Sequence, residues 1–177
     1  MTDPFPAETD LFPTRGPWQP PQAWSGRLGE RAHLADWLAL ESSLTNALRA
    51  VCGARFALRV HNRSRVALPG AAAGLLDRPV GETVAQREVF LSCGDADVVF
   101  ARSWIPAGVL ADPGEYPLGD RLFEPDAAVR RLRLEAAPVA GPGGETLWAR
   151  RSLHQTQWTV FEETTGLLVD GSAFPVV

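Results

Sequence analysis

The chain has 177 residues, of which 45% are hydrophobic and 21% are charged, and its net charge is −4. This length and composition indicate one globular domain with a sizeable core rather than a disordered segment. The mild acidity argues against nucleic acid as a partner, because a nucleic-acid surface normally needs clustered basic side chains. The chain contains no lysine, so all 17 cationic side chains are arginines, and Schiff-base chemistry on a lysine is excluded.

The cellular location of the protein and the absence of a metal site are both predicted from sequence patterns that the chain lacks. No run of about 18 apolar residues occurs, so we expect no membrane insertion. The acidic, proline-broken start "MTDPFPAETDLFP" has no basic flank and no apolar core, so we expect no signal peptide and a cytoplasmic protein. Cys52 and Cys93 form no CxxC pattern, and we expect two buried free thiols. His33, His61 and His154 lack the usual ligand spacing, so no metal site is expected.

The N-terminal part is expected to be an irregular, proline-rich arm, residues 1–30, followed by one domain that covers residues 31–177. The arm shows no periodic apolar pattern, and its tryptophans can attach it to the domain. Beyond the arm, apolar residues at helical spacing are interrupted by a pair of serines, and serine favours the N-cap of a helix. The pattern predicts two short helices, 33–41 and 43–52.

The rest of the domain is predicted to be mainly β-strands. Apolar runs rich in β-branched residues surround glycine-containing turns and indicate two hairpins. The expected strands are 56–60, 65–68, 87–93, 98–105, 129–139 and 147–157. A loop at 111–126 is thick with turn residues and has room for one helical turn. These elements predict an α+β domain with a single antiparallel sheet behind two N-terminal helices.

The first hairpin, "REVFLSCGDADVVFAR", carries an arginine at each end of an apolar face. Gly94-Asp95 suits a two-residue hairpin turn. An uninterrupted register then places Arg87 directly opposite Arg102 on one face of the sheet. Like charges in this position are destabilising unless an anion bridges them. The hairpin therefore predicts an anion receptor, and a local carboxylate partner for each arginine is the alternative.

Two further strands carry neighbouring arginines, and the alternation of side chains along a strand predicts their faces. In "VRRLRLE" we expect Arg131 and Arg133 to share one solvated face. In "LWARRS" we expect Arg150 and Arg151 to face opposite ways, so that one of them points inward.

Five motifs occur in the same order, and with similar spacing, as in bacterial chorismate lyases. They are "DWLALESSLTNAL", "REVFLSC", "ARSWIP", "PLGDRLF" and "LWARRS". The sequence resembles this family over nearly everything beyond the arm. The resemblance implies a chorismate pyruvate-lyase, which eliminates pyruvate from chorismate to release 4-hydroxybenzoate at the entry to ubiquinone biosynthesis. It also implies flap-like helices over a buried ligand and no cofactor. We expect the protein to be a monomer.

The resemblance assigns roles to four residues. Arg87 matches the arginine that holds the aromatic carboxylate and is a catalytic candidate, and Arg102 matches a second arginine of the pocket. Leu118 matches the position whose backbone meets the same carboxylate. Leu44 stands where the family often has methionine and lines the pocket from the helix side. Chorismate carries two carboxylates, and arginine offers a bidentate fork for each.

The catalytic carboxyl group at the C-terminus has two candidates. The family has a glutamate there that meets the hydroxyl end of the product. Matching "LLV" indicates Asp170, whereas the distance from "RRS" indicates Glu163. The turn-like "ETTG" favours Asp170, which we take as the first candidate. A carboxyl group in a closed apolar pocket has a raised pKa and can donate a proton near neutral pH.

Two other functions remain open from the sequence. One is a degenerate lyase that binds 4-hydroxybenzoate, for which the altered C-terminus is the argument. The other is a non-catalytic sensor of small aromatic acids, because the effector-binding domains of some GntR-type regulators resemble this fold. Such regulators carry a basic winged-helix domain ahead of the effector domain, which an arm of 30 residues cannot supply.

Overall fold

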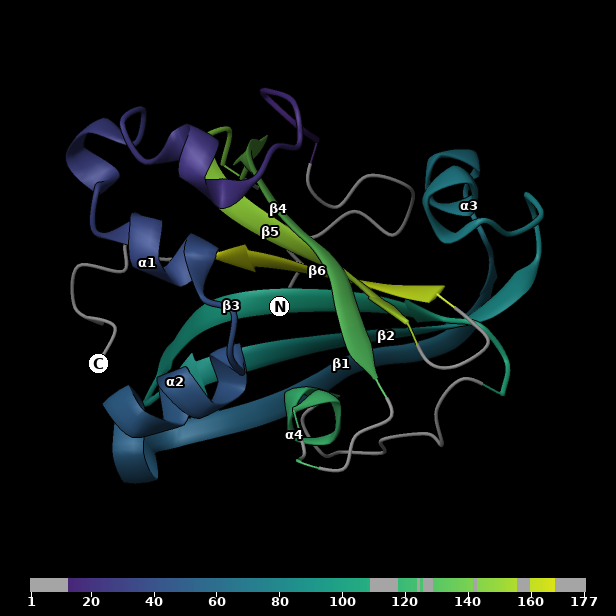
Figure 1. Cartoon of the computed structure of the whole chain (residues 1–177). Coiled ribbons are helices and arrows are strands. Elements are labelled where there is room, and N and C mark those ends of the chain that lie inside the picture. Colours follow the sequence, from purple (N-terminus) through teal and green to yellow (C-terminus); the bar gives the residue numbers. More distant parts are fainter. Residues whose placement is uncertain are drawn as a thin grey trace.

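The computed structural model describes residues 13–108, 118–123, 125, 129–141, 143–155 and 160–167. Six antiparallel strands form one sheet in the order β1-β2-β3-β6-β5-β4 (Figure 1). The strands are β1 Phe56–Ala67, β2 Thr83–Cys93, β3 Ala96–Ile105, β4 Arg130–Ala140, β5 Thr146–Gln155 and β6 Val160–Leu167. The α-helices are α1 Leu34–Ala39, α2 Leu44–Cys52, α3 Gly70–Leu76 and α4 Leu118–Leu122, and short 3-10 helices span Pro21–Trp24, Gly29–Arg31 and Gly53–Arg55. The predicted α+β class is confirmed.

Both predicted N-terminal helices are confirmed, as α1 and α2. Ser43 caps α2, since its hydroxyl accepts a hydrogen bond from the backbone N–H of Asn46 at 3.2 Å. Gly53 ends the helix with a φ of 57°, which favours glycine. The two predicted strand pieces after α2 join into the single strand β1, and α3 forms in the alanine-rich stretch that we had not assigned to any element.

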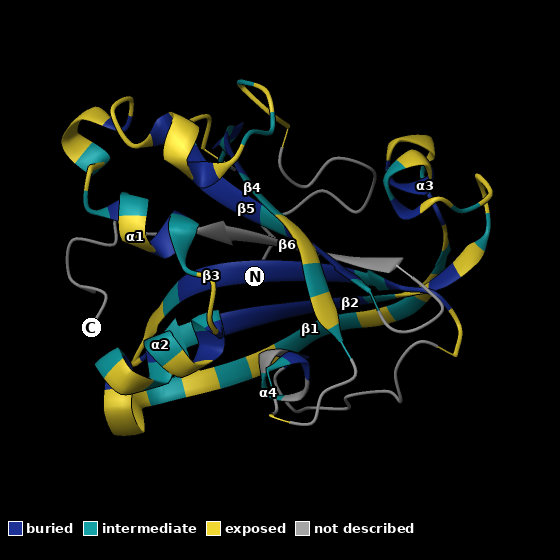
Figure 2. Cartoon of the chain, in the orientation of Figure 1, coloured by how far each residue is buried: buried dark blue, intermediate teal, exposed yellow. Residues whose placement is uncertain are grey.

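The sheet is covered differently on its two faces. On one face, called the α2 face, α1 and α2 bury their apolar stripes around Val89 and Leu91 of β2. On the other, called the α3 face, α3 packs around Val84 and Leu153. Burial of these apolar side chains is the main stabilising contribution to the fold. Figure 2 shows that β3 and much of β2 are buried, whereas the edge strand β1 alternates between exposed and partly buried residues.

The described part of the N-terminal arm lies along β4. Thr14 and Gln19 form isolated bridges to this strand. Trp24 is buried, and its indole Nε1 donates a hydrogen bond to the carbonyl oxygen of Ala136 at 2.8 Å. Its ring also packs edge-to-face against Trp148 of β5. A buried indole that satisfies its N–H in this way holds the arm against the sheet.

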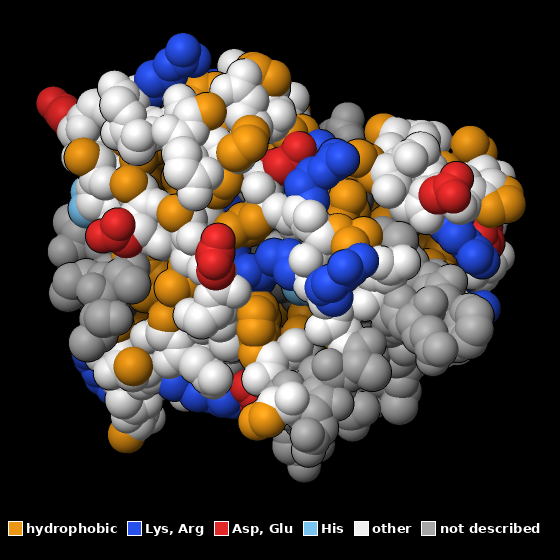
Figure 3. All heavy atoms as spheres, in the orientation of Figure 1, with side chains coloured by type: hydrophobic (Ala, Val, Ile, Leu, Met, Phe, Trp, Pro, Cys, Tyr) orange, Lys and Arg blue, Asp and Glu red, His pale blue; other side chains and the backbone are white. Residues whose placement is uncertain are grey.

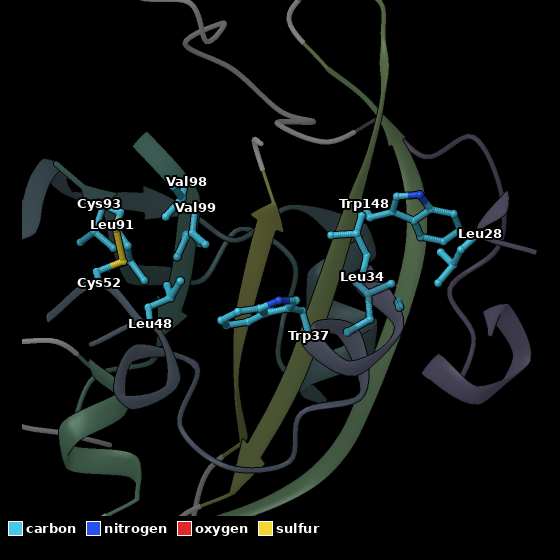
Figure 4. Packing of buried hydrophobic residues seen from close by; sticks show 14 of the residues in the cluster. Leu28, Leu34, Trp37, Leu48, Cys52, Leu91, Cys93, Val98, Val99 and Trp148 are labelled. Atoms are coloured by element: carbon cyan, nitrogen blue, oxygen red, sulfur yellow. A yellow bond between two sulfur atoms is a disulfide. The ribbon is translucent and has the colours of Figure 1, made fainter. Parts of the chain in front are cut away.

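Cys52 and Cys93 form a disulfide (Figure 4), so the expectation of two free thiols is wrong. Cys52 is the last residue of α2 and Cys93 the last residue of β2, and their Cα atoms are 5.5 Å apart. The two cysteines are separated by 41 residues in sequence, and the pairing of Phe56 with Cys93 together with the packing of α2 on the sheet brings them together. The disulfide attaches the end of α2 to the hairpin end of β2.

The first hairpin has the predicted turn but not the predicted register. Cys93 pairs with Ala96, as a two-residue turn requires, but Val98 is an extra residue that forms a bulge in β3. Beyond the bulge, Arg87 pairs with Ser103 and Arg102 pairs with Glu88. A shift of one residue moves a side chain to the other face of a sheet. The expectation that Arg87 and Arg102 face each other is therefore wrong, and they lie on opposite faces.

A second bulge, at Leu132 in β4, separates another pair of arginines. Arg131 pairs with His154, whereas Arg133 pairs with Leu153 on the neighbouring strand. The two arginines thus lie on opposite faces, and the expectation of one shared solvated face is wrong.

The alternation predicted for the two arginines of β5 is confirmed. Arg150 is buried and donates a hydrogen bond to the carbonyl oxygen of Trp37 at 2.9 Å. Arg151 instead pairs with Glu135 at 2.8 Å and stacks over Trp18.

Strand β6 lies inside the sheet and pairs with both β3 and β5. It includes the segment 163–166, "ETTG", which was expected to be a turn, so that expectation is wrong. The sheet context overrides the local turn propensity of these polar residues. None of the helices in the described part of the chain is long and apolar enough to cross a membrane.

Candidate ligand-binding site

One row of the sheet brings two predicted site residues into register. Residues that pair directly across antiparallel strands are the closest neighbours on a sheet. Following these pairs from edge to edge gives Arg63, Arg87, Ser103, Glu163, Ser152 and Leu134, one residue from each of the six strands. We call this set the arginine row. It contains Arg87 and the register position of Glu163.

Three residues of the arginine row are polar and almost fully buried. Arg87 is 5% exposed, and Ser103 and Ser152 are each 3% exposed. Burial of polar groups is costly unless they find hydrogen-bonding partners. A line of buried polar side chains across the sheet is therefore a candidate place to bind a polar ligand.

The arginine row lies between two helical covers on the α2 face. Two residues before Ser103 on β3, Ala101 belongs to the apolar cluster of α1 and α2. Two residues after Ser103, Ile105 belongs to a cluster with α4. Residues two apart on a strand share a face, so the row passes between α2 and α4.

The two covers are α2 and α4, and their first residues are Leu44 and Leu118. Leu44 begins α2 and packs against the main apolar cluster, while Leu118 begins α4 and is 3% exposed. Arg49 of α2 forms a bidentate ion pair with Asp120 of α4, with distances of 2.7 and 2.9 Å. Bidentate geometry fixes orientation as well as distance, so the ion pair holds the two covers together beside the arginine row.

A groove of about 400 Å³ opens between α2 and the residue that follows α4. Its size falls within the range of small-molecule sites. It is lined by Leu40, Ser42, Ser43, Asn46, Ala47, Ala50 and Phe123. At its end, Arg131 stacks over Phe123 and donates a hydrogen bond to the carbonyl oxygen of Glu41 at 2.6 Å. Figure 3 shows arginine side chains in the hollowed centre of this side of the molecule.

On the α2 face, two arginines lie close to the buried imidazole of His154. His154 is 2% exposed, and burial lowers its pKa to about 3, with further lowering by the charges of Arg131 and Arg150. The imidazole is therefore uncharged near neutral pH, while the arginines around it remain cationic. We had not predicted His154 or Arg150 as site residues. Their spacing of four along β5 was the available signal, because it places both side chains on one face.

Arg102 lies on the α3 face in a closed network. Its Nε and Nη2 donate to Oε1 of Glu88 at 2.8 and 2.5 Å. The same Glu88 oxygen accepts a hydrogen bond from Nε2 of Gln86 at 3.2 Å, and the side-chain Oε1 of Gln86 accepts one from the indole Nε1 of Trp104 at 2.8 Å. The structure thus brings Arg87, Leu44 and Leu118 to one face and Arg102 to the other. Asp170 lies outside the described residues.

Comparison with known sequences gives a consistent result. The sequence profile of the chorismate lyase family matches residues 13–161. A relative from Azoarcus sp. named "Probable chorismate pyruvate-lyase" is 33% identical over 144 residues, covering 75% of this chain and 74% of the relative. A relative of the same name from Methylococcus capsulatus is 34% identical over 139 residues, covering 68% of this chain and 85% of the relative.

Solved structures share the fold at low sequence identity. The ligand-binding domain of a GntR-family transcriptional regulator from Bordetella bronchiseptica superposes with a TM-score of 0.51 at 22% identity, covering 65% of this chain and 85% of that domain. A GntR-family regulator from Bacillus cereus gives a TM-score of 0.51 at 10% identity, covering 65% of this chain and 92% of that structure. These likenesses concern the fold alone.

Proposed function

Because this chain belongs to the chorismate lyase family, we propose that it eliminates pyruvate from chorismate and releases 4-hydroxybenzoate for ubiquinone biosynthesis. The observation that carries the proposal is the buried Arg87 in a row of polar residues between α2 and α4. A guanidinium group in such a place suits a carboxylate, because charge-assisted bidentate bonds offset the desolvation of both groups.

The proposed reaction rearranges bonds within chorismate itself. The ring C–H next to the ether carbon lies near the methylene of the enolpyruvyl group and transfers its hydrogen there. The bond between the ring and the ether oxygen breaks, the side chain leaves as pyruvate, and the ring becomes aromatic. The protein supplies orientation of the reacting conformer and stabilisation of negative charge. We expect the reaction to need no cofactor.

Each residue on the α2 face has a proposed part in this reaction. Arg87 holds the ring carboxylate, and the backbone N–H of Leu118 meets the same carboxylate. Leu44 packs against the ring from the helix side. The covers α2 and α4 move apart to admit the substrate and then exclude water, which strengthens the electrostatic interactions within the site.

The carboxyl group at the hydroxyl end of the ring is assigned to Glu163 in this proposal. Its support is the register, since Glu163 pairs with Ser103 and Ser152 in the arginine row. Two strand spacings, roughly 10 Å, separate its backbone from that of Arg87, a separation that suits a ring with a polar group at each end. The argument that favoured Asp170 was a turn at "ETTG", and this segment is a strand.

The experiment is to incubate the pure protein with chorismate and EDTA and to follow both products. We expect equimolar 4-hydroxybenzoate and pyruvate. Activity that appears only after a divalent metal is added would contradict the cofactor-free mechanism. Binding of 4-hydroxybenzoate without turnover of chorismate would instead identify the protein as a binder with the family fold.

A further inference from the structure

Arg63 lies directly opposite Arg87 because of a bulge in β1. His61 is the extra residue of this bulge, and the register on its two sides differs by one residue. Without the bulge, Arg63 would pair with Gln86, and its side chain would belong to the α3 face. The bulge therefore brings a second arginine to the α2 face, at the position next to the buried one.

Two arginines in this arrangement favour an anion between them. Directly opposite residues of an antiparallel pair have Cβ atoms about 4.5–5.5 Å apart, and like charges at this distance are destabilising. The repulsion becomes an attraction when a carboxylate is bound by both guanidinium groups, or when each binds one carboxylate of the same molecule. Bulges often re-aim side chains beside binding sites, which is the effect of the His61 bulge.

The two arginines differ in depth. Arg87 is 5% exposed on the second strand of the sheet, whereas Arg63 is exposed on the edge strand β1. A ligand that engages both must have one anionic group at the sheet interior and another toward the edge. Chorismate has its two carboxylates on different parts of the molecule, one on the ring and one on the enolpyruvyl side chain.

We propose that Arg63 binds the enolpyruvyl carboxylate of chorismate while Arg87 holds the ring carboxylate. This inference rests on the proposed lyase function. In this proposal Arg63 takes the role of the second pocket arginine that was expected for Arg102. The Val98 bulge turns Arg102 toward Glu88 on the other face. It also predicts a selective effect, because elimination removes the enolpyruvyl group. The product 4-hydroxybenzoate has one carboxylate and loses the contact with Arg63, so Arg63 favours substrate binding without strengthening product inhibition.

Arg65 provides a matched control for Arg63. It lies on the same strand and the same face, it is also exposed, and it pairs with Ala85 rather than with an arginine. It is two residues, or about 7 Å, further along the strand. Arg63→Ala and Arg65→Ala remove the same charge from the same edge, and only the first removes the neighbour of Arg87.

The test measures affinity by calorimetry for two ligands that the protein does not convert. One is 3-(1-carboxyvinyloxy)benzoate, which carries both carboxylates on a ring that is already aromatic, and the other is 4-hydroxybenzoate. We expect Arg63→Ala to weaken binding of the dicarboxylate about tenfold, as for loss of one exposed charge-assisted contact. Its affinity for 4-hydroxybenzoate remains that of the wild type, and its melting temperature does not fall, because the variant loses a like-charge repulsion. Arg65→Ala changes neither affinity.

The same variants are then assayed with chorismate, where Arg63→Ala is expected to raise KM about tenfold. An unchanged dicarboxylate affinity, or an equal loss for both ligands, overturns the role of Arg63. If Arg63 makes the protein prefer the dicarboxylate but the wild type does not convert chorismate, the lyase function is refuted. The binding role of Arg63 is then still supported. If Arg63→Ala converts chorismate with the wild-type KM, the binding role of Arg63 is refuted and the lyase function is not.

Discussion

Two arginines of the β2–β3 hairpin are almost equally buried but lie in different surroundings. Arg102, at 8% exposed, is held by Glu88 within a network on the α3 face. Arg87, at 5% exposed, lies on the α2 face in a row with Ser103 and a second arginine, Arg63. Burial by itself therefore does not distinguish an arginine in a structural ion pair from one that we propose to bind a ligand. The charge and polarity of the neighbours on the same face make the distinction.

The largest expected effect is on Arg102. Arg102→Ala leaves Glu88 buried without its cation, so we expect the free energy of unfolding to fall by about 3–5 kcal/mol, measured by urea denaturation. The double variant Glu88→Leu with Arg102→Met removes both charges and should recover most of this loss. A stable Arg102→Ala protein that has lost affinity for chorismate would mean that Arg102 is a site residue after all.

For Arg87 we expect the opposite pattern, a loss of binding rather than of stability. Arg87→Ala removes the charge-assisted fork for the ring carboxylate, so the affinity for 4-hydroxybenzoate should weaken by roughly 2–4 kcal/mol. Calorimetry on the folded variant measures this, with Arg65→Ala as the control. Wild-type affinity in folded Arg87→Ala would place Arg87 with Arg102 among the structural residues.

His154 tests the electrostatics of the α2 face through pH. Its pKa is about 3 in the folded protein, below the usual value of 6.5, so between these pH values the unfolded chain binds a proton that the folded protein does not. Stability is thus complete above pH 6.5 and is lost as the pH falls below it, by about 1.4 kcal/mol for each unit. At pH 5 we expect a loss of about 2 kcal/mol relative to pH 7.

The measurement is denaturant unfolding at pH 5 and 7 for the wild type and for His154→Gln. The variant cannot take up this proton, so the part of the pH dependence that belongs to His154 disappears from it. Identical pH profiles for the two proteins would show that the imidazole is protonated as easily in the folded state as in the unfolded chain.

The smallest expected effect distinguishes the two candidate carboxyl groups. Glu163→Gln should lower kcat by at least about tenfold, because the hydroxyl end of the ring loses the carboxyl group that orients it, while Asp170→Asn changes little. Steady-state assays with chorismate measure both. The reverse result would restore the alignment through "LLV". A native kcat in both variants would mean that elimination proceeds without either carboxyl group.

Local patterns were sufficient for α1, α2, the turn of the first hairpin and the family, but not for α3 or β6. Helical spacing and a serine cap predicted α1 and α2, and Gly94-Asp95 predicted the turn that pairs Cys93 with Ala96. These features depend on neighbours a few residues away, so the amino-acid order contains the required information. The same holds for the ordered motifs around Arg87, which indicate the chorismate lyase family.

The faces on which the arginines lie depended on the tertiary structure. Bulges at His61, Val98 and Leu132 each insert one residue, which brings Arg63 to Arg87, turns Arg102 to Glu88 and separates Arg131 from Arg133. The position of a bulge depends on how both strands and the helices above them pack together, and strand composition does not record it. The disulfide between α2 and β2 has the same origin, because it forms only where a distant helix meets the sheet.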